Sequence, residues 1–212
     1  LVGPLERLED RLEKAWSPVS HLNSVVNSEA LREAYNACLP ALSAYHTEMG
    51  QNRALYEAFK ALREDAGFDQ LEQPERQTIE NALRDFELAG VALDDKAKQR
   101  YAEIAARLAE LSSRFQENLL DATNAWHRDI DDPEALAGIP ESALGVMRQN
   151  AEHNGASGWR VSLDMPVVQA VLAYAENRAL REEVYHAFTT RASDVGPHAG
   201  QWDNHPLMAE II

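Results

Sequence analysis

The stretch at residues 94–129, DDKAKQRYAEIAARLAELSSRFQENLLDATNAWHRD, decides the fold class of this chain. It contains neither Gly nor Pro, and its apolar residues recur at steps of three and four, from Ala97 through Leu111 to Trp126. This spacing is that of one face of an α-helix, and a helix of this length would measure roughly 50 Å at ~1.5 Å per residue. Because a helix with so long an apolar stripe must pack against other helices, the stretch predicts a bundle built around one long helix.

Four shorter helical segments precede this stretch. The first is predicted to stop at Pro18. The second is predicted to begin after Ser28, a residue type favoured at the N-cap, and to close at Gly50 in the left-handed conformation. Pro40 lies inside the second segment, where a kink or a split is expected. The third runs to residue 67, and the fourth opens at Pro74, a residue suited to the first turn of a helix.

The pattern changes after Trp126. Trp159, Val161 and Leu163 alternate with polar residues, which is typical of a β-strand. One strand needs a partner, and the nearest candidate is the segment at residues 127–130, so we expect a small hairpin-like β ribbon.

The expected fold is therefore all-α (mainly helical), an antiparallel helical bundle with one long helix and a small β ribbon. We predict an N-terminal helical block at residues 1–129, a mixed connector with a short helix and the ribbon at 130–165, and further helices at 166–212.

Composition excludes several classes of function. The chain has 212 residues, 45% of them hydrophobic, and a formal net charge of −15, so it can bury a core and would repel phosphate backbones and anionic lipid. We therefore expect no nucleic-acid partner and no membrane partner. The single cysteine, Cys38, cannot form an internal disulfide, and its helical context predicts a buried, inert thiol. These features predict a cytoplasmic location.

The motifs of common catalytic sites are absent. A zinc peptidase holds its metal with H-E-x-x-H, but none of the seven histidines is followed by Glu. The sequence also contains no G-x-S-x-G, no phosphate-binding G-x-x-x-x-G-K-[ST] and no G-x-G-x-x-G. We therefore predict no catalytic residue and no cofactor-binding residue in this chain.

Residues 182–206, EEVYHAFTTRASDVGPHAGQWDNHP, are rich in metal-ligand residue types. His198, Asp203 and His205 could form a metal site with His186 nearby, although their spacing matches no known framework. Loop and surface histidines are the favoured interpretation, and we expect no metal ligand here.

A structural clasp is the preferred interpretation of the same region. Arg181 and Tyr185 lie four residues apart and share a helix face, Arg191 follows that helix, and Asp203 and Asn204 end the loop. We predict that Arg181 or Arg191 pairs with Asp203 and pins the loop across the helix end. Such a pair would stabilise the fold and would take no part in catalysis.

Four separated blocks resemble the thimet-oligopeptidase-like family of zinc metallopeptidases. They are SPVSHLNSVVNSEALREAY, NALRDFELAG, LDAT and NRALREEVYHAFTTRASDVGPHAGQWDN, in that order, and the resemblance runs from about residue 16 to residue 212. It implies a cytoplasmic, monomeric, mostly helical enzyme of two lobes around a deep channel, which cleaves short peptides. It also implies that zinc is held in the C-terminal lobe by H-E-x-x-H and a further Glu.

This chain resembles the N-terminal part of such an enzyme and ends before the zinc motif, so no metal or catalytic residue of the family can be carried onto it. The resemblance implies one wall of the channel, and by itself the chain is expected to be inactive. The chain ends in HPLMAEII, an uncapped helical pattern with apolar Leu207, Met208, Ile211 and Ile212, which predicts a piece of a longer protein. Such a piece would leave these four side chains exposed or paired with a neighbouring molecule, and it could self-associate through them. The alternative is a stand-alone helical peptide-binding or scaffold module, which would close its last helix. The acidic surface further suggests a preference for basic peptides.

Overall fold

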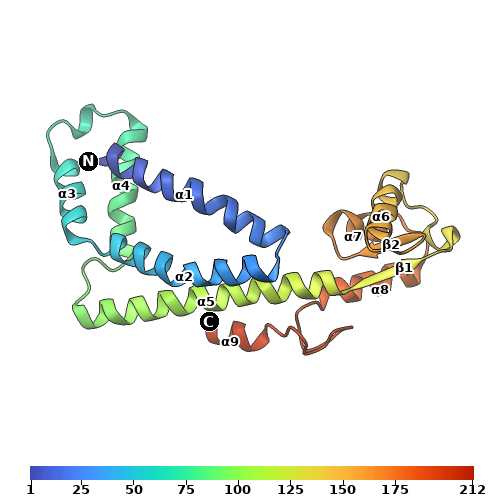
Figure 1. The fold of residues 1–212 in the computed structure, drawn as a ribbon. Helices are drawn as coiled ribbons and strands as arrows, with labels where there is room; N and C mark the ends of the chain where they lie inside the picture. Colours follow the sequence, from blue (N-terminus) through green and yellow to red (C-terminus); the bar gives the residue numbers. More distant parts are fainter. The chain divides into compact units, whose positions relative to one another are not determined.

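The computed structural model describes all 212 residues as a mainly helical chain with one two-stranded sheet (Figure 1). The chain divides into two compact units, Leu1–Ser113 and Arg114–Ile212. The prediction of a mainly helical fold with one long helix and a small β ribbon is confirmed. The predicted division of the chain into three segments, with boundaries after residues 129 and 165, stays a prediction. None of the helices combines the length and the apolar character that crossing a lipid bilayer requires.

The first unit consists of helices joined by short turns, in which α1 packs against α2 and α3 against α4. Its elements are α1 (Val2–Val25), α2 (Glu29–Gly50), α3 (Arg53–Glu64), the 3-10 helix η1 (Phe68–Gln70), α4 (Gln73–Leu88) and the first part of α5 (Asp95–Ala125). Ser28 is the N-cap of α2 as predicted, and its Oγ accepts a hydrogen bond from the backbone N–H of Leu31 at 3.3 Å. α3 and α4 pack together over a small core whose buried members are Phe59, Phe68, Ile79, Phe86 and Val91.

The prediction that the first helix stops at Pro18 is wrong, because α1 continues through this proline to Val25. A proline inside a helix lacks the N–H of one ladder hydrogen bond and normally weakens the helix. Here the ring of Trp16 stacks on Tyr35 of α2, with centroids 4.9 Å apart and planes inclined by 18°. Packing against α2 thus offsets the local cost. Pro40 likewise lies within a continuous α2, so the predicted split does not occur.

Gly50 has a different role from the predicted left-handed cap. It is the last residue of α2, has no positive φ, and is followed by Gln51 as the cap. A Cβ on Gly50 would lie 2.7 Å from the Cβ of Ala89, which follows α4. The glycine is therefore required because the chain passes close to Ala89, and Gln51 Nε2 donates to the carbonyl of Ala89 at 3.1 Å beside it.

Two further predictions are corrected by the structure. Cys38 is exposed, so the predicted burial of its thiol is wrong. The long helix α5 ends at Ala125, before the predicted continuation to residue 129, because the chain enters a β-strand after Trp126.

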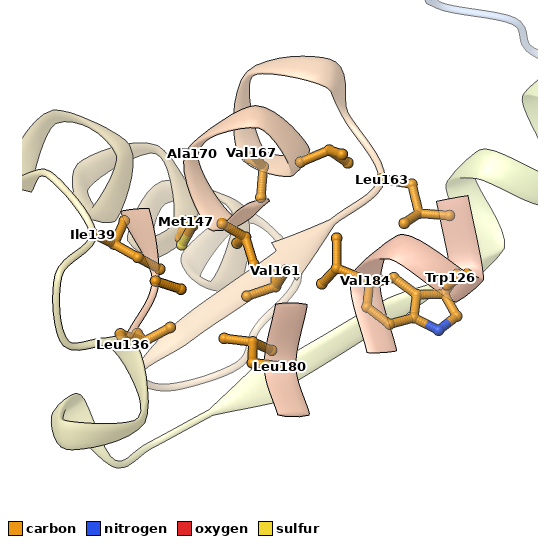
Figure 2. Packing of buried hydrophobic residues seen from close by; sticks show 14 residues of the cluster. Trp126, Leu136, Ile139, Met147, Val161, Leu163, Val167, Ala170, Leu180 and Val184 are labelled. Atoms are coloured by element: carbon orange, nitrogen blue, oxygen red, sulfur yellow. The ribbon is translucent and has the colours of Figure 1, made fainter. Parts of the chain in front are cut away.

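The second unit is a small α+β arrangement. It contains the end of α5, β1 (His127–Ile130), the 3-10 helix η2 (Pro133–Leu136), α6 (Glu141–His153), β2 (Trp159–Ser162), α7 (Met165–Tyr174), α8 (Arg178–Thr189) and α9 (His205–Ile211). The predicted ribbon is confirmed, since β1 and β2 pair antiparallel with His127 opposite Ser162 and Ile130 opposite Trp159. Side chains of α6, α7 and α8 gather around Val161 of β2, which is completely buried (Figure 2).

The other face of the ribbon carries an ion pair. Asp129 lies directly opposite Arg160, and its two carboxylate oxygens accept hydrogen bonds of 2.7 and 2.8 Å from the guanidinium. This two-point contact holds the pKa of Asp129 below its ordinary value and raises the pKa of Arg160. The pair fixes the register of the two strands from the solvent side.

The apolar residues of α9 differ in burial. Leu207 is buried, which corrects the expectation that all of these side chains would be exposed, whereas Met208 and Ile212 are exposed.

Adding one methyl group should have opposite effects at two helical glycines. Gly50→Ala should lower the free energy of unfolding, because the new Cβ collides with Ala89. Gly145→Ala, inside α6 with nothing within 4 Å of the new Cβ, should raise it by about 0.5–1 kcal/mol through helix propensity. Urea denaturation followed by circular dichroism measures both variants. Equal effects would contradict the close approach at Gly50.

The Asp129–Arg160 pair should make stability depend on pH. The pKa of Asp129 is lowered in the folded state, so its carboxylate stabilises the fold above the ordinary value of about 3.9 and loses this effect as pH falls through the lowered pKa. Asp129→Asn should therefore destabilise at pH 7 and have a smaller effect near pH 3. Urea denaturation at both pH values tests this, with Glu152→Gln, an exposed carboxylate on α6, as the control. A penalty for Asp129→Asn that does not change with pH would contradict the assignment.

Candidate functional site

The segment between α8 and α9 folds back on itself. The backbone N–H of Asn204 donates to the carbonyl of Ala192 at 3.0 Å, and that of Gly200 donates to the carbonyl of Ser193 at 3.0 Å. Gly196 has a φ of +92°, and a Cβ at this position would collide with the side chain of Thr190. The two backbone hydrogen bonds close the loop on itself. The turn at Gly196 requires glycine, because any side chain there would collide with Thr190.

Asn204 ties this loop to α5. Its side chain is 4% exposed, accepts a hydrogen bond from Asn118 Nδ2 at 2.9 Å, and donates to the carbonyl of Phe115 at 3.1 Å. A buried amide is tolerated only when its polar atoms are paired, and here both ends of the amide are used. Asn204 is thus the member of the predicted clasp that holds the loop in place.

The two arginines of the predicted clasp bind backbone carbonyls instead of Asp203. Arg181 Nη1 donates to the carbonyls of Ala175 and Glu176, just after the end of α7. These carbonyls have no partner within the helix, so a cation placed there satisfies them and opposes the negative end of the helix dipole. Tyr185, on the same helix, is 59% exposed.

Arg191 turns back onto its own helix. Its guanidinium lies 3.8 Å from the centroid of the Phe188 ring and donates to the Phe188 carbonyl. Burial lowers the pKa of Arg191, which agrees with a guanidinium held against an aromatic ring. The predicted pair of Arg181 or Arg191 with Asp203 is not formed, because both guanidiniums are occupied by nearer acceptors.

Asp203 serves the start of α9. Its Oδ1 accepts from the backbone N–H of His205 at 2.9 Å and lies 2.9 Å from His205 Nδ1. Asp194 Oδ1 lies 3.4 Å from the same nitrogen. His198, the other candidate ligand of this loop, packs edge-on against Trp202 at 5.5 Å between ring centroids.

The geometry gives this region a structural role. No group of three or more His, Cys, Asp or Glu side chains is arranged to hold a metal ion. The polar groups of this region hydrogen-bond to one another and to backbone groups at the ends of α7, α8 and α9. These contacts are those of a structural connection between α8 and α9.

Sequence reasoning missed Asn118, although a signal for it exists. Asn118 follows Phe115 by three residues and precedes Ala122 by four, so it occupies a position of the apolar stripe of α5. A polar residue at a stripe position needs a polar partner, and Asn204 is that partner.

Removing the Asn204 side chain should destabilise the second unit. Asn204→Ala leaves Asn118 without its acceptor and the Phe115 carbonyl without its extra donor, at a cost of about 1–3 kcal/mol. Gln201→Ala, an exposed substitution in the same loop, should stay within about 0.5 kcal/mol of the unchanged chain. Urea denaturation compares the two, and equal losses would show that the amide does not hold the loop.

Comparison with known proteins agrees with the four blocks identified above. The family model for the neurolysin/thimet oligopeptidase N-terminal domain matches residues 1–98. Oligopeptidase A of Haemophilus influenzae is 53% identical over 209 residues, which cover 99% of this chain and 31% of that protein. Oligopeptidase A of Escherichia coli is 48% identical over 212 residues, covering 100% of this chain and 31% of that protein.

A plant relative extends the comparison. The probable cytosolic oligopeptidase A of Arabidopsis thaliana is 35% identical over 219 residues, covering 100% of this chain and 30% of that protein. The chain thus spans less than a third of the length of these curated relatives. It belongs to the neurolysin/thimet oligopeptidase family and corresponds to the N-terminal part of the oligopeptidase A proteins.

Proposed function

We propose that this chain is the N-terminal, non-catalytic region of a cytoplasmic zinc metallopeptidase that hydrolyses short peptides. One observation carries the proposal: the identity of 48–53% to bacterial oligopeptidase A proteins extends over 99–100% of the chain. Similarity that runs through both compact units is difficult to reconcile with an unrelated scaffold module.

The residues of this chain do not fit the zinc that the family implies. The sequence lacks H-E-x-x-H. His198 packs on Trp202, and one nitrogen of His205 lies near the carboxylates of Asp194 and Asp203, but these side chains are not arranged to hold a metal ion. A hydrolytic zinc site needs three protein ligands around one ion. In our proposal, residues outside this chain hold the metal and carry the chemistry.

The contribution of this chain is then enclosure of the substrate. We propose that its helices form one wall of a channel that admits flexible peptides and excludes folded proteins. Confinement of this kind selects by size and flexibility and requires no reacting group. The intact enzyme is proposed to act as a monomer on short peptides.

Peptide cleavage should be found in the longer protein and be absent from the 212-residue chain. The full reading frame, expressed alongside the 212-residue chain, should bind stoichiometric zinc and cleave an internally quenched short peptide, and a chelator should abolish the cleavage. The 212-residue chain should fold and cleave nothing. Zinc content by elemental analysis and peptide turnover measure both properties. Stoichiometric zinc together with turnover in the 212-residue chain would overturn the proposal, whereas a reading frame without a zinc motif would favour a stand-alone module.

A further inference from the structure

A groove of about 340 Å³ opens within the first unit between α1, α2 and α4. Its floor is aromatic, formed by Phe59 and Phe86, which are 3% and 9% exposed and whose ring centroids lie 5.7 Å apart. Leu5 and Met49 add apolar walls. This volume is at the lower end of small-ligand sites and accommodates a side chain with its adjoining backbone.

The rim of this groove is acidic. Glu6 and Glu9, three residues apart on α1, line it from one side, and Asp85 of α4 lines it from the other. Its lining residues include one histidine, His46, and no Lys or Arg. Asp85 has a neighbouring cation, Arg84, at 3.4 Å, whereas Glu6 and Glu9 form no ion pair. Carboxylates beside an apolar wall create a negative potential that attracts a cation into the groove.

Two other grooves show that this combination is not general. The groove between α6 and α7, of about 930 Å³, is lined by Val146, Ala170, Tyr174 and similar residues and contains no charged side chain. The groove beside Trp16 and Tyr101 in the first unit also lacks carboxylates. An aromatic floor and an acidic rim occur together at the α1–α2–α4 groove and at neither of these two, so the groove is complementary to a group that is both apolar and cationic.

We propose that this groove binds a peptide segment in which a cationic residue adjoins an aromatic or aliphatic one. The apolar side chain would cover the ring of Phe86, and its burial supplies the main driving force. The cationic neighbour would lie among the carboxylates of Glu6, Glu9 and Asp85. The inference rests on the proposed function in one respect, namely that the ligand is a peptide. Binding to the groove is measured without cleavage, so the experiment does not depend on catalytic activity.

The test is calorimetric titration of the 212-residue chain with blocked tetrapeptides at low ionic strength. Acetyl-Phe-Arg-Phe-Lys-amide should bind with one-to-one stoichiometry, and its affinity should fall as salt rises. Acetyl-Gly-Arg-Gly-Lys-amide, which keeps the charge and loses the rings, should bind at least about 10-fold more weakly. Acetyl-Phe-Glu-Phe-Glu-amide should show no binding.

Matched variants locate the binding. The triple variant Glu6→Gln, Glu9→Gln, Asp85→Asn should weaken binding about 10-fold and flatten the salt dependence. A control triple, Glu13→Gln, Glu33→Gln, Asp69→Asn, removes the same number of charges from exposed positions outside the groove and should change affinity less than about 2-fold.

A third variant blocks the groove and leaves its charges in place. Thr78 is an exposed lining residue, so Thr78→Trp should fill the groove without disturbing the core and should reduce binding at least about 10-fold. Circular dichroism confirms that each variant is folded.

Two outcomes would overturn the inference. One is the absence of binding by the unchanged chain. The other is binding that survives Thr78→Trp and falls equally in both triple variants, because the general acidity of the surface would then explain it. Either result leaves the proposed function intact, since that function is tested by peptide turnover in the longer protein.

Discussion

The apolar stripe of α5 runs through both compact units, and each unit has to cover its own part of it. Most of the stability of a helix within a protein comes from packing of its apolar face against other elements. Leu111, in the first unit, is 1% exposed, and Ala122, in the second, is 2% exposed. Between the ends of the stripe, Ile104 and Leu108 remain 44% and 37% exposed. The stripe is therefore covered in parts, and each unit supplies its own partners.

Each unit also joins α5 to another element through a polar contact. In the first unit, Ser113 Oγ donates to Asn36 Oδ1 of α2 at 2.9 Å, and in the second, Asn118 donates to Asn204 at 2.9 Å. Apolar contacts do not specify the rotation or height of a helix closely, whereas a hydrogen bond between two side chains does. These contacts fix where the covering elements meet α5, after which apolar packing supplies most of the stability.

Much of this fold could be predicted from the sequence because its signals are local. The cap at Ser28, the helix start at Pro74 and the alternation around Val161 depend on neighbours a few residues away, and all three agree with the structure. The predictions failed where a distant residue decides the outcome. The helix passes through Pro18 because Trp16 stacks on α2, and Gly50 is needed because Ala89 lies against it. No local pattern contains this information.

The candidate site shows the same limit. Sequence reasoning singled out this loop and Asn204, but it paired Arg181 or Arg191 with Asp203 on the basis of opposite charge. The structure instead satisfies the arginines with carbonyls at helix ends, and Asp203 with the first turn of α9. Backbone carbonyls at helix ends are hydrogen-bond acceptors that compete with carboxylates for arginine side chains. An argument from side-chain charge alone leaves them out and therefore overestimates the number of ion pairs.

A polypeptide region that supplies no reacting group can still determine which substrates react. Interactions that hold substrate and transition state equally well lower KM and leave kcat unchanged, whereas interactions that position the reacting bond raise kcat. Under the proposed function, binding in the α1–α2–α4 groove belongs to the first kind unless the bound segment also fixes the scissile peptide at the zinc. Its acidic rim would then enrich cationic peptides without altering the chemical step. A preference visible in KM and absent from kcat would be the kinetic signature of such a region.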